Sequence, residues 1–125
     1  MKYIHTEKAP KVVGPYSQAI VSSGFIFCSG QIGIDPEIGT LVEGFEKQTN
    51  QVMKNLMNVL KEAKSDFNHV VKVTVYLADI NDYKQMNEIY GQYFSEHKPT
   101  RAAFAVADLP AGALIEIEMI AEVKQ

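Results

Sequence analysis

The chain has 125 residues, of which 46% are apolar and 22% charged, so we expect one globular domain with a single core over residues 1–125. Its formal charge of −3 and scattered lysines offer no general attraction to nucleic acid or to an anionic membrane, and no stretch approaches the ~20 apolar residues of a transmembrane helix. The single cysteine cannot form an internal disulfide and the N-terminus lacks the apolar segment of a secretory signal, so we expect a cytoplasmic protein.

The first half of the chain predicts an extended arm, a hairpin and a helix. Residues 1–17 contain two prolines and a glycine that prevent a helix, and predict a short arm followed by a loop. Residues 18–21 and 25–31 are strand-like runs joined by a Ser-Ser-Gly turn. Residues 34–42 carry turn chemistry and predict a loop. Residues 45–63 have apolar residues at three- and four-residue spacing, which predicts an amphipathic helix. Its apolar stripe consists of Val52, Leu56, Val59, Leu60 and Ala63.

The second half predicts a strand, a helix and two further strands. Residues 70–77 alternate between an apolar and a more polar face, with Val71, Val73, Val75 and Leu77 on the apolar one. Asp79, Asn81 and Asp82 supply cap chemistry for a helix that runs to about residue 94. Residues 102–106 and 113–123 predict the closing strands.

Two helices are too few to cover both faces of this sheet, so both should lie on one face, which gives a two-layer α+β fold. The last strand supports this arrangement, because one of its faces is wholly apolar and the other alternates apolar residues with glutamates. The mixed face consists of Leu114, Glu116, Glu118, Ile120 and Glu122. It is too polar for a core and too apolar for bare solvent, which favours a homo-oligomer over the alternative, a monomer with one solvated face.

Arg101 is the only arginine beside eleven lysines, and it precedes the apolar run of residues 102–106. Its guanidinium group can bind a carboxylate in a bidentate manner, which an ammonium group cannot. Glu116, inside the last strand, could activate a water molecule. A solvated arginine and a surface glutamate are the alternatives, and the residues alone do not rank Glu116 above Glu118.

Other positions could line a pocket or could be purely structural. Tyr16 lies where a loop enters the hairpin, and could form a pocket wall or cover a sheet edge. The Gly30 position, next to Ser29, predicts either close approach of a ligand or backbone, or a β-bulge. Asn87 is a polar residue on a mostly apolar side of the second helix, and could bond to a loop or face water.

No pattern indicates a metal site or a nucleophile. The histidines are far apart in the sequence, at positions 5, 69 and 97, and none has a partner at metal-ligand spacing. Cys28 lies among apolar strand residues and is interpreted as a buried small hydrophobe.

Taken together, these segments resemble the RidA family of reactive-intermediate (imine/enamine) deaminases, over nearly the whole chain. The matching segments are residues 14–19 (GPYSQA), 29–32 (SGQI), 48–60, 86–90 (MNEIY), 99–103 (PTRAA), 109–110 and 115–118 (IEIE). No single motif would suffice, but their order along one short chain is specific.

The resemblance implies a chorismate-mutase-like fold, assembled as a homotrimer with ligand clefts between subunits. It also implies a cofactor-free hydrolysis of 2-aminoacrylate-type enamines and their imine tautomers to 2-keto acids and ammonia. The family's carboxylate-binding arginine aligns with Arg101 and its water-handling glutamate with Glu116. The resemblance therefore favours Glu116 over Glu118 for this role. Its substrate-binding positions align with Tyr16, Ser29, Gly30, Asn87 and Ala103.

One departure bears on the chemistry. Many members have Ser-Cys after the arginine, where this chain has Ala102-Ala103. We expect that only the main chain is needed there, because the reaction uses water rather than a covalent intermediate. A non-catalytic metabolite-binding, regulatory or chaperone-like trimer is the alternative function, and the acidic balance argues against a role with RNA.

Overall fold

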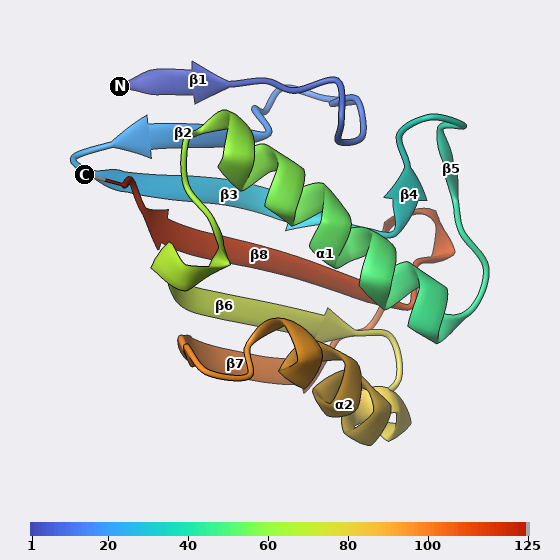
Figure 1. Ribbon diagram of the computed structural model, residues 1–125. Coiled ribbons are helices and arrows are strands. Elements are labelled where there is room, and N and C mark those ends of the chain that lie inside the picture. Colours follow the sequence, from blue (N-terminus) through green and yellow to red (C-terminus); the bar gives the residue numbers. More distant parts are fainter. Residues whose placement is uncertain (125) are drawn as a thin grey trace.

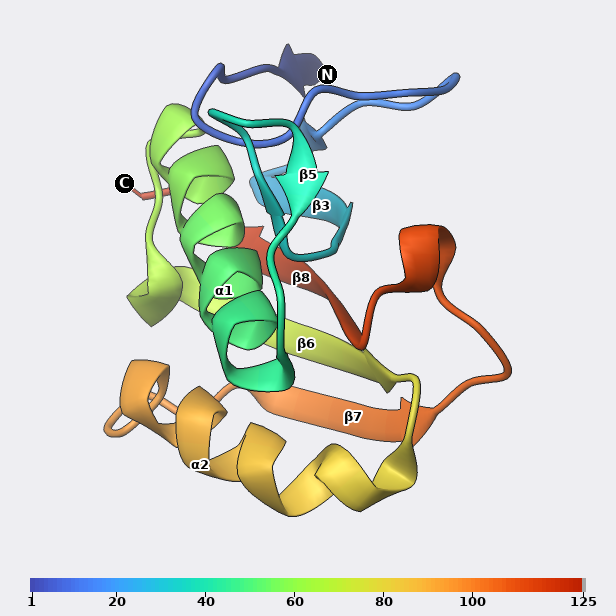
Figure 2. The same ribbon diagram turned by 90° about the vertical axis from the view of Figure 1, so that its right-hand side faces the viewer.

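The computed structural model describes residues 1–124 and contains a six-stranded sheet with two helices on one face (Figures 1 and 2). The helices are α1 (Phe45–Glu62) and α2 (Tyr83–Tyr93). In sheet order the strands are β1 (Lys2–Ile4), β2 (Ala19–Ser22), β3 (Phe25–Gln31), β8 (Ile115–Glu122), β6 (Val70–Leu77) and β7 (Thr100–Ala105). Only β6 and β7 pair in parallel, so the sheet is mixed. The predicted two-layer α+β fold is confirmed.

The core lies between the sheet and α1, which crosses the central strands in Figure 1. All five residues predicted to form the apolar stripe of α1 are buried. The apolar face of β8 is buried beneath them, because Ile115, Ile117, Met119 and Ala121 are almost completely inaccessible to solvent. This burial of apolar area is the main term that stabilises the two layers.

Three details differ from the expectations. A bulge opposite β8 lies between Val70 and Lys72, so Val70 takes the core position and Val71, expected there, is only half-buried. Residues 34–42 are not all loop, since β4 (Ile34–Asp35) and β5 (Thr40–Leu41) form a small separate hairpin. The strand expected at residue 102 already begins at Thr100, which places Arg101 inside β7.

The sheet face away from the helices has the mixed character that the sequence predicts. Phe27 and Phe104 are each 46% exposed on it, beside half-buried Glu116, Glu118 and Ile120. Its covering by another copy of the chain stays a prediction. No helix within residues 1–124 is long and apolar enough to cross a lipid bilayer.

Candidate active site

Arg101 points from β7 toward α2. It pairs in register with Val73, whose side chain is completely buried on the helix-covered face of the sheet. One guanidinium nitrogen, Nη2, donates a hydrogen bond of 3.0 Å to the Tyr83 hydroxyl. The Cζ atom lies 4.9 Å from the centre of the Tyr90 ring, within cation–π range. The aromatic side chains of α2 therefore hold the guanidinium group in one orientation.

Arg101 lines a pocket of about 440 Å³ between α2 and the edge of the sheet. The other lining residues are Asn87, Tyr90, Gly91, Phe94, Lys98 and Pro99. Asn87, whose role the sequence left open, is thus brought next to Arg101. Because two cationic side chains share a pocket that carries no carboxylate among its lining residues, this pocket suits a small organic anion.

Glu116 lies on the other face of the sheet, opposite Tyr76 of β6. Its carboxyl group is half-buried, and this burial raises its pKa above the ordinary value, with a further increase from the negative charge of Glu118. Glu118 differs, because its carboxylate accepts a hydrogen bond from the Tyr76 hydroxyl. That bond is the main reason that the pKa of Tyr76 is raised to about 12. Glu116 has no hydrogen-bond partner among residues 1–124. The structure therefore distinguishes Glu116 from Glu118 without recourse to the family resemblance.

Gly30 is in close contact with Glu116. A Cβ atom at position 30 would overlap with the Glu116 carboxylate, so any other residue would displace that side chain. The pairing of β3 with β8 also shifts register between Cys28 and Gln31. Of the two alternatives at this glycine, the β-bulge is confirmed, whereas the group in close approach is the Glu116 side chain rather than a ligand or another backbone segment.

Glu116 lines a second pocket, of about 200 Å³. Its walls come from the arm between β1 and β2, from the end of β3 and from the turn at Pro110 and Ala111. Tyr16 belongs to the arm wall and is 52% exposed. Figure 2 shows the arm (blue) and the turn (red) projecting on the same side of the molecule.

The structure thus divides the predicted site residues into two groups on opposite faces of the sheet. Arg101 and Asn87 share one pocket, and Tyr16, Gly30 and Glu116 share the other. Ser29 and Ala103 line neither: the Ser29 hydroxyl donates a hydrogen bond of 2.6 Å to the Ser17 carbonyl, and Ala103 packs on the core. Among residues 1–124 of one chain, Arg101 and Glu116 line different pockets.

Three residues at these pockets were not predicted as site residues. These are Tyr83 and Tyr90, which contact the Arg101 guanidinium group, and Lys98, which lines the Arg101 pocket. The signal was the spacing along the helix: Tyr83 lies four residues before Asn87 and Tyr90 three residues after it, which places all three side chains on one side of the helix. The parallel pairing that brings Arg101 beneath that helix was not evident from local sequence.

Cys28 is buried, as predicted, and burial raises the pKa of its thiol to about 12, which makes it a poor nucleophile. Within the part of the chain that the structure describes, no three His, Cys, Asp or Glu side chains form a group that could hold a metal ion.

Comparison with known proteins places this site in context. The family described as endoribonuclease L-PSP matches residues 6–123. The chain belongs to this family. The human 2-iminobutanoate/2-iminopropanoate deaminase is 52% identical over 96% of this chain and 88% of that protein. A RutC family protein of Pyrococcus abyssi is 56% identical over 94% of both chains.

Two solved structures that are similar in sequence have the same fold. The crystal structure of RidA from a Psychrobacter species superposes with a TM-score of 0.96 at 42% identity, over 98% of this chain and 100% of that one. E. coli TdcF with bound serine superposes with a TM-score of 0.94 at 35% identity, over 99% and 100% of the two chains. The resemblance to the RidA family and the fold that it implies are therefore confirmed.

Proposed function

We propose that this protein hydrolyses 2-imino acids and their enamine tautomers, of the 2-aminoacrylate type, to 2-keto acids and ammonia. The deaminase names of relatives that are 50–53% identical support the reaction. The observation that carries the proposal within this chain is the state of Glu116: a half-buried carboxyl group in a pocket, with a raised pKa and no hydrogen-bond partner among the described residues. Such a group is suited to accept a proton from water and to return it.

The mechanism assigns one task to each half of the site. Arg101 binds the substrate carboxylate with its two parallel N–H groups and fixes the imine carbon, while Asn87 lines the same pocket. Water held by Glu116 adds to the C2 carbon of the imine, and its proton passes through Glu116 to the nitrogen. The hydroxyl proton of the carbinolamine then passes through Glu116 to the nitrogen as the C–N bond breaks, which releases ammonia and leaves a 2-keto acid. Tyr16 and the main chain at Gly30 and Ala103 orient the substrate, Ser29 supports the Tyr16 loop, and no cofactor takes part.

The two halves meet only if copies of the chain assemble. Because Arg101 and Glu116 lie on opposite faces of one sheet, we propose that Arg101 of one copy faces Glu116 of the next in a homotrimer. The exposed Phe27 and Phe104 on the open face supply apolar surface for such an interface. The relative solved with bound serine, an amino acid with a carboxylate, is compatible with a carboxylate-binding cleft.

The reaction is tested by generating 2-aminoacrylate in situ from serine with a dehydratase, in the presence of an amine that captures the free intermediate. The wild-type protein should accelerate the appearance of pyruvate, and Arg101→Ala, which cannot bind the carboxylate, should match the buffer control. Equal rates for wild type and Arg101→Ala would contradict the proposal. A non-catalytic metabolite-binding or regulatory trimer predicts that equality.

Cleavage of RNA, suggested by the family description, is less well supported by this chain. The chain is acidic overall, and Lys98 with Arg101 forms only a small cationic pocket. A cytoplasmic location accords with the single buried cysteine and belongs to the same proposal.

A further inference from the structure

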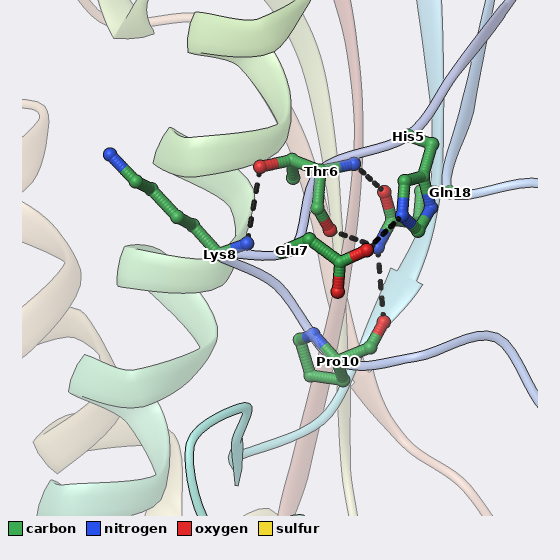
Figure 3. Close-up of polar contacts among 6 residues, drawn as sticks. All are labelled: His5, Thr6, Glu7, Lys8, Pro10 and Gln18. Atoms are coloured by element: carbon green, nitrogen blue, oxygen red, sulfur yellow. Dashed lines mark hydrogen bonds and ion pairs between the residues drawn. The ribbon is translucent and has the colours of Figure 1, made fainter.

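The side chain of Gln18 makes three hydrogen bonds to the backbone of the N-terminal arm, residues 5–17 (Figure 3). It is only 2% exposed. Its Oε1 accepts from the Thr6 amide at 2.7 Å, and its Nε2 donates to the carbonyls of Thr6 and Pro10, each at 3.1 Å. The residue immediately before β2 thus fastens two points of the arm that lie 8 and 12 residues away.

The fastened arm is one wall of the Glu116 pocket, to which it contributes Pro10, Val12, Val13 and Tyr16. Gln18 itself lines the same pocket. Most of the arm between Lys11 and Tyr16 is exposed, so it has little packing of its own to hold it in place. The bond to the Pro10 carbonyl therefore fixes the point from which this exposed stretch departs.

We propose that Gln18 is a positioning residue that holds the arm as the outer wall of the Glu116 pocket and so limits the access of solvent to that carboxylate. The inference rests on the proposed function only for its effect on turnover. Glutamine is required because the arm offers one donor and two acceptors, and only a primary amide of this length supplies both kinds of group. Loss of the amide leaves buried backbone groups unpaired, which opens the arm.

Four charged or titratable side chains surround Glu116. Glu118 and Tyr76 face it from the sheet, and Lys11 and Tyr16 line its pocket from the arm. Opening of the arm moves Lys11 and Tyr16 away and hydrates the carboxyl group, whereas the sheet residues stay in place. Hydration stabilises the ionised form, so the Glu116 pKa should fall toward its ordinary value.

Limited trypsin digestion tests the fastening without any turnover. In Gln18→Met, cleavage after Lys8 and Lys11, followed by mass spectrometry, should be at least about tenfold faster than in wild type, because both bonds lie in the released arm. Gln18→Glu, which keeps the acceptor but loses both amide donors, should also be cleaved faster. Asn58→Ala is the matched control, since Asn58 donates from α1 to the Lys8 carbonyl at 2.9 Å and lies outside the Glu116 pocket. Its cleavage after Lys11 should stay near the wild-type rate.

The effect on the site is measured by NMR titration of the Glu116 carboxyl carbon and by the KM and kcat for a 2-imino acid. In Gln18→Met the Glu116 pKa should fall and kcat/KM should decrease, and a merely structural role elsewhere would not shift that titration. Wild-type cleavage rates in both Gln18 variants, or faster cleavage with an unchanged Glu116 titration, would overturn the inference. If wild type itself fails to hydrolyse imines, the proposed function fails, while the digestion and the titration still decide the role of Gln18.

Discussion

Arg101→Lys should reduce kcat/KM for a 2-imino acid by at least about 100-fold, close to the loss in Arg101→Ala. A lysine keeps the positive charge but loses the planar pair of N–H groups that a carboxylate accepts. It also loses the bond to the Tyr83 hydroxyl, which at 3.0 Å fixes the rotation of the guanidinium group. The site would then bind a carboxylate without fixing the imine carbon.

The measurement is pyruvate appearance in the in situ assay, with thermal unfolding of each variant to show that the fold is retained. Tyr83→Phe serves as an intermediate case, because it removes only the hydroxyl that accepts from Nη2. We expect a smaller loss in Tyr83→Phe than in Arg101→Lys, seen mainly in KM. Near wild-type turnover in Arg101→Lys would show that charge alone suffices and would contradict bidentate binding.

Glu116→Gln should reduce kcat by at least about 100-fold, because an amide cannot carry the proton between water and the leaving nitrogen. The same substitution should raise thermal stability at pH 7 by about 1–3 °C. The sign follows from the raised pKa of Glu116, since the folded state then binds the proton more tightly than the unfolded state. Ionised Glu116 therefore destabilises the fold at neutral pH. The difference in Tm should disappear as the pH falls below 4.5, the ordinary value at which the unfolded carboxyl also becomes protonated.

Glu118→Gln is the matched control, on the same strand and the same face. The Glu118→Gln variant should retain turnover, because the Glu118 carboxylate accepts a hydrogen bond from the Tyr76 hydroxyl and does not line the pocket of Glu116. Loss of its charge removes one cause of the raised Glu116 pKa, so the acid limb of the pH–rate profile should move to lower pH. A loss of turnover in Glu118→Gln as large as that in Glu116→Gln would contradict the assignment of roles.

Local patterns predicted most of the fold because both helices and the long strands have clear periodicity. The stripe of Val52, Leu56 and Val59 marked α1, and the alternation in β8 marked which of its faces meets the helices. The misplaced Val71 shows the limit of alternation, since the bulge that turns it away depends on pairing with a distant strand. The small β4–β5 hairpin was missed because two-residue strands leave no periodic signal.

The sequence predicted which residues belong to the site, but not that they lie in two pockets on opposite faces of the sheet. Motif resemblance named Arg101 and Glu116, yet only the sheet order and register place them on opposite faces. β7 pairs in parallel with β6 and β8 pairs antiparallel on its other side, and neither pairing is encoded in a local run of residues. Likewise, Gln18 was part of a matching motif without an assigned task, because its partners, Thr6 and Pro10, are identified only by the folded arm.

Mixing two inactive variants tests most directly whether the site is built from two copies. Arg101→Ala and Glu116→Gln protomers, unfolded together at equal amounts and refolded, should regain about a quarter of the wild-type pyruvate-forming activity. The fraction follows because one in about four randomly formed interfaces pairs an intact Arg101 with an intact Glu116. Each variant refolded alone should stay inactive. A refolded mixture that contains mixed oligomers and yet remains as inactive as its parents would contradict a site shared between Arg101 of one copy and Glu116 of another.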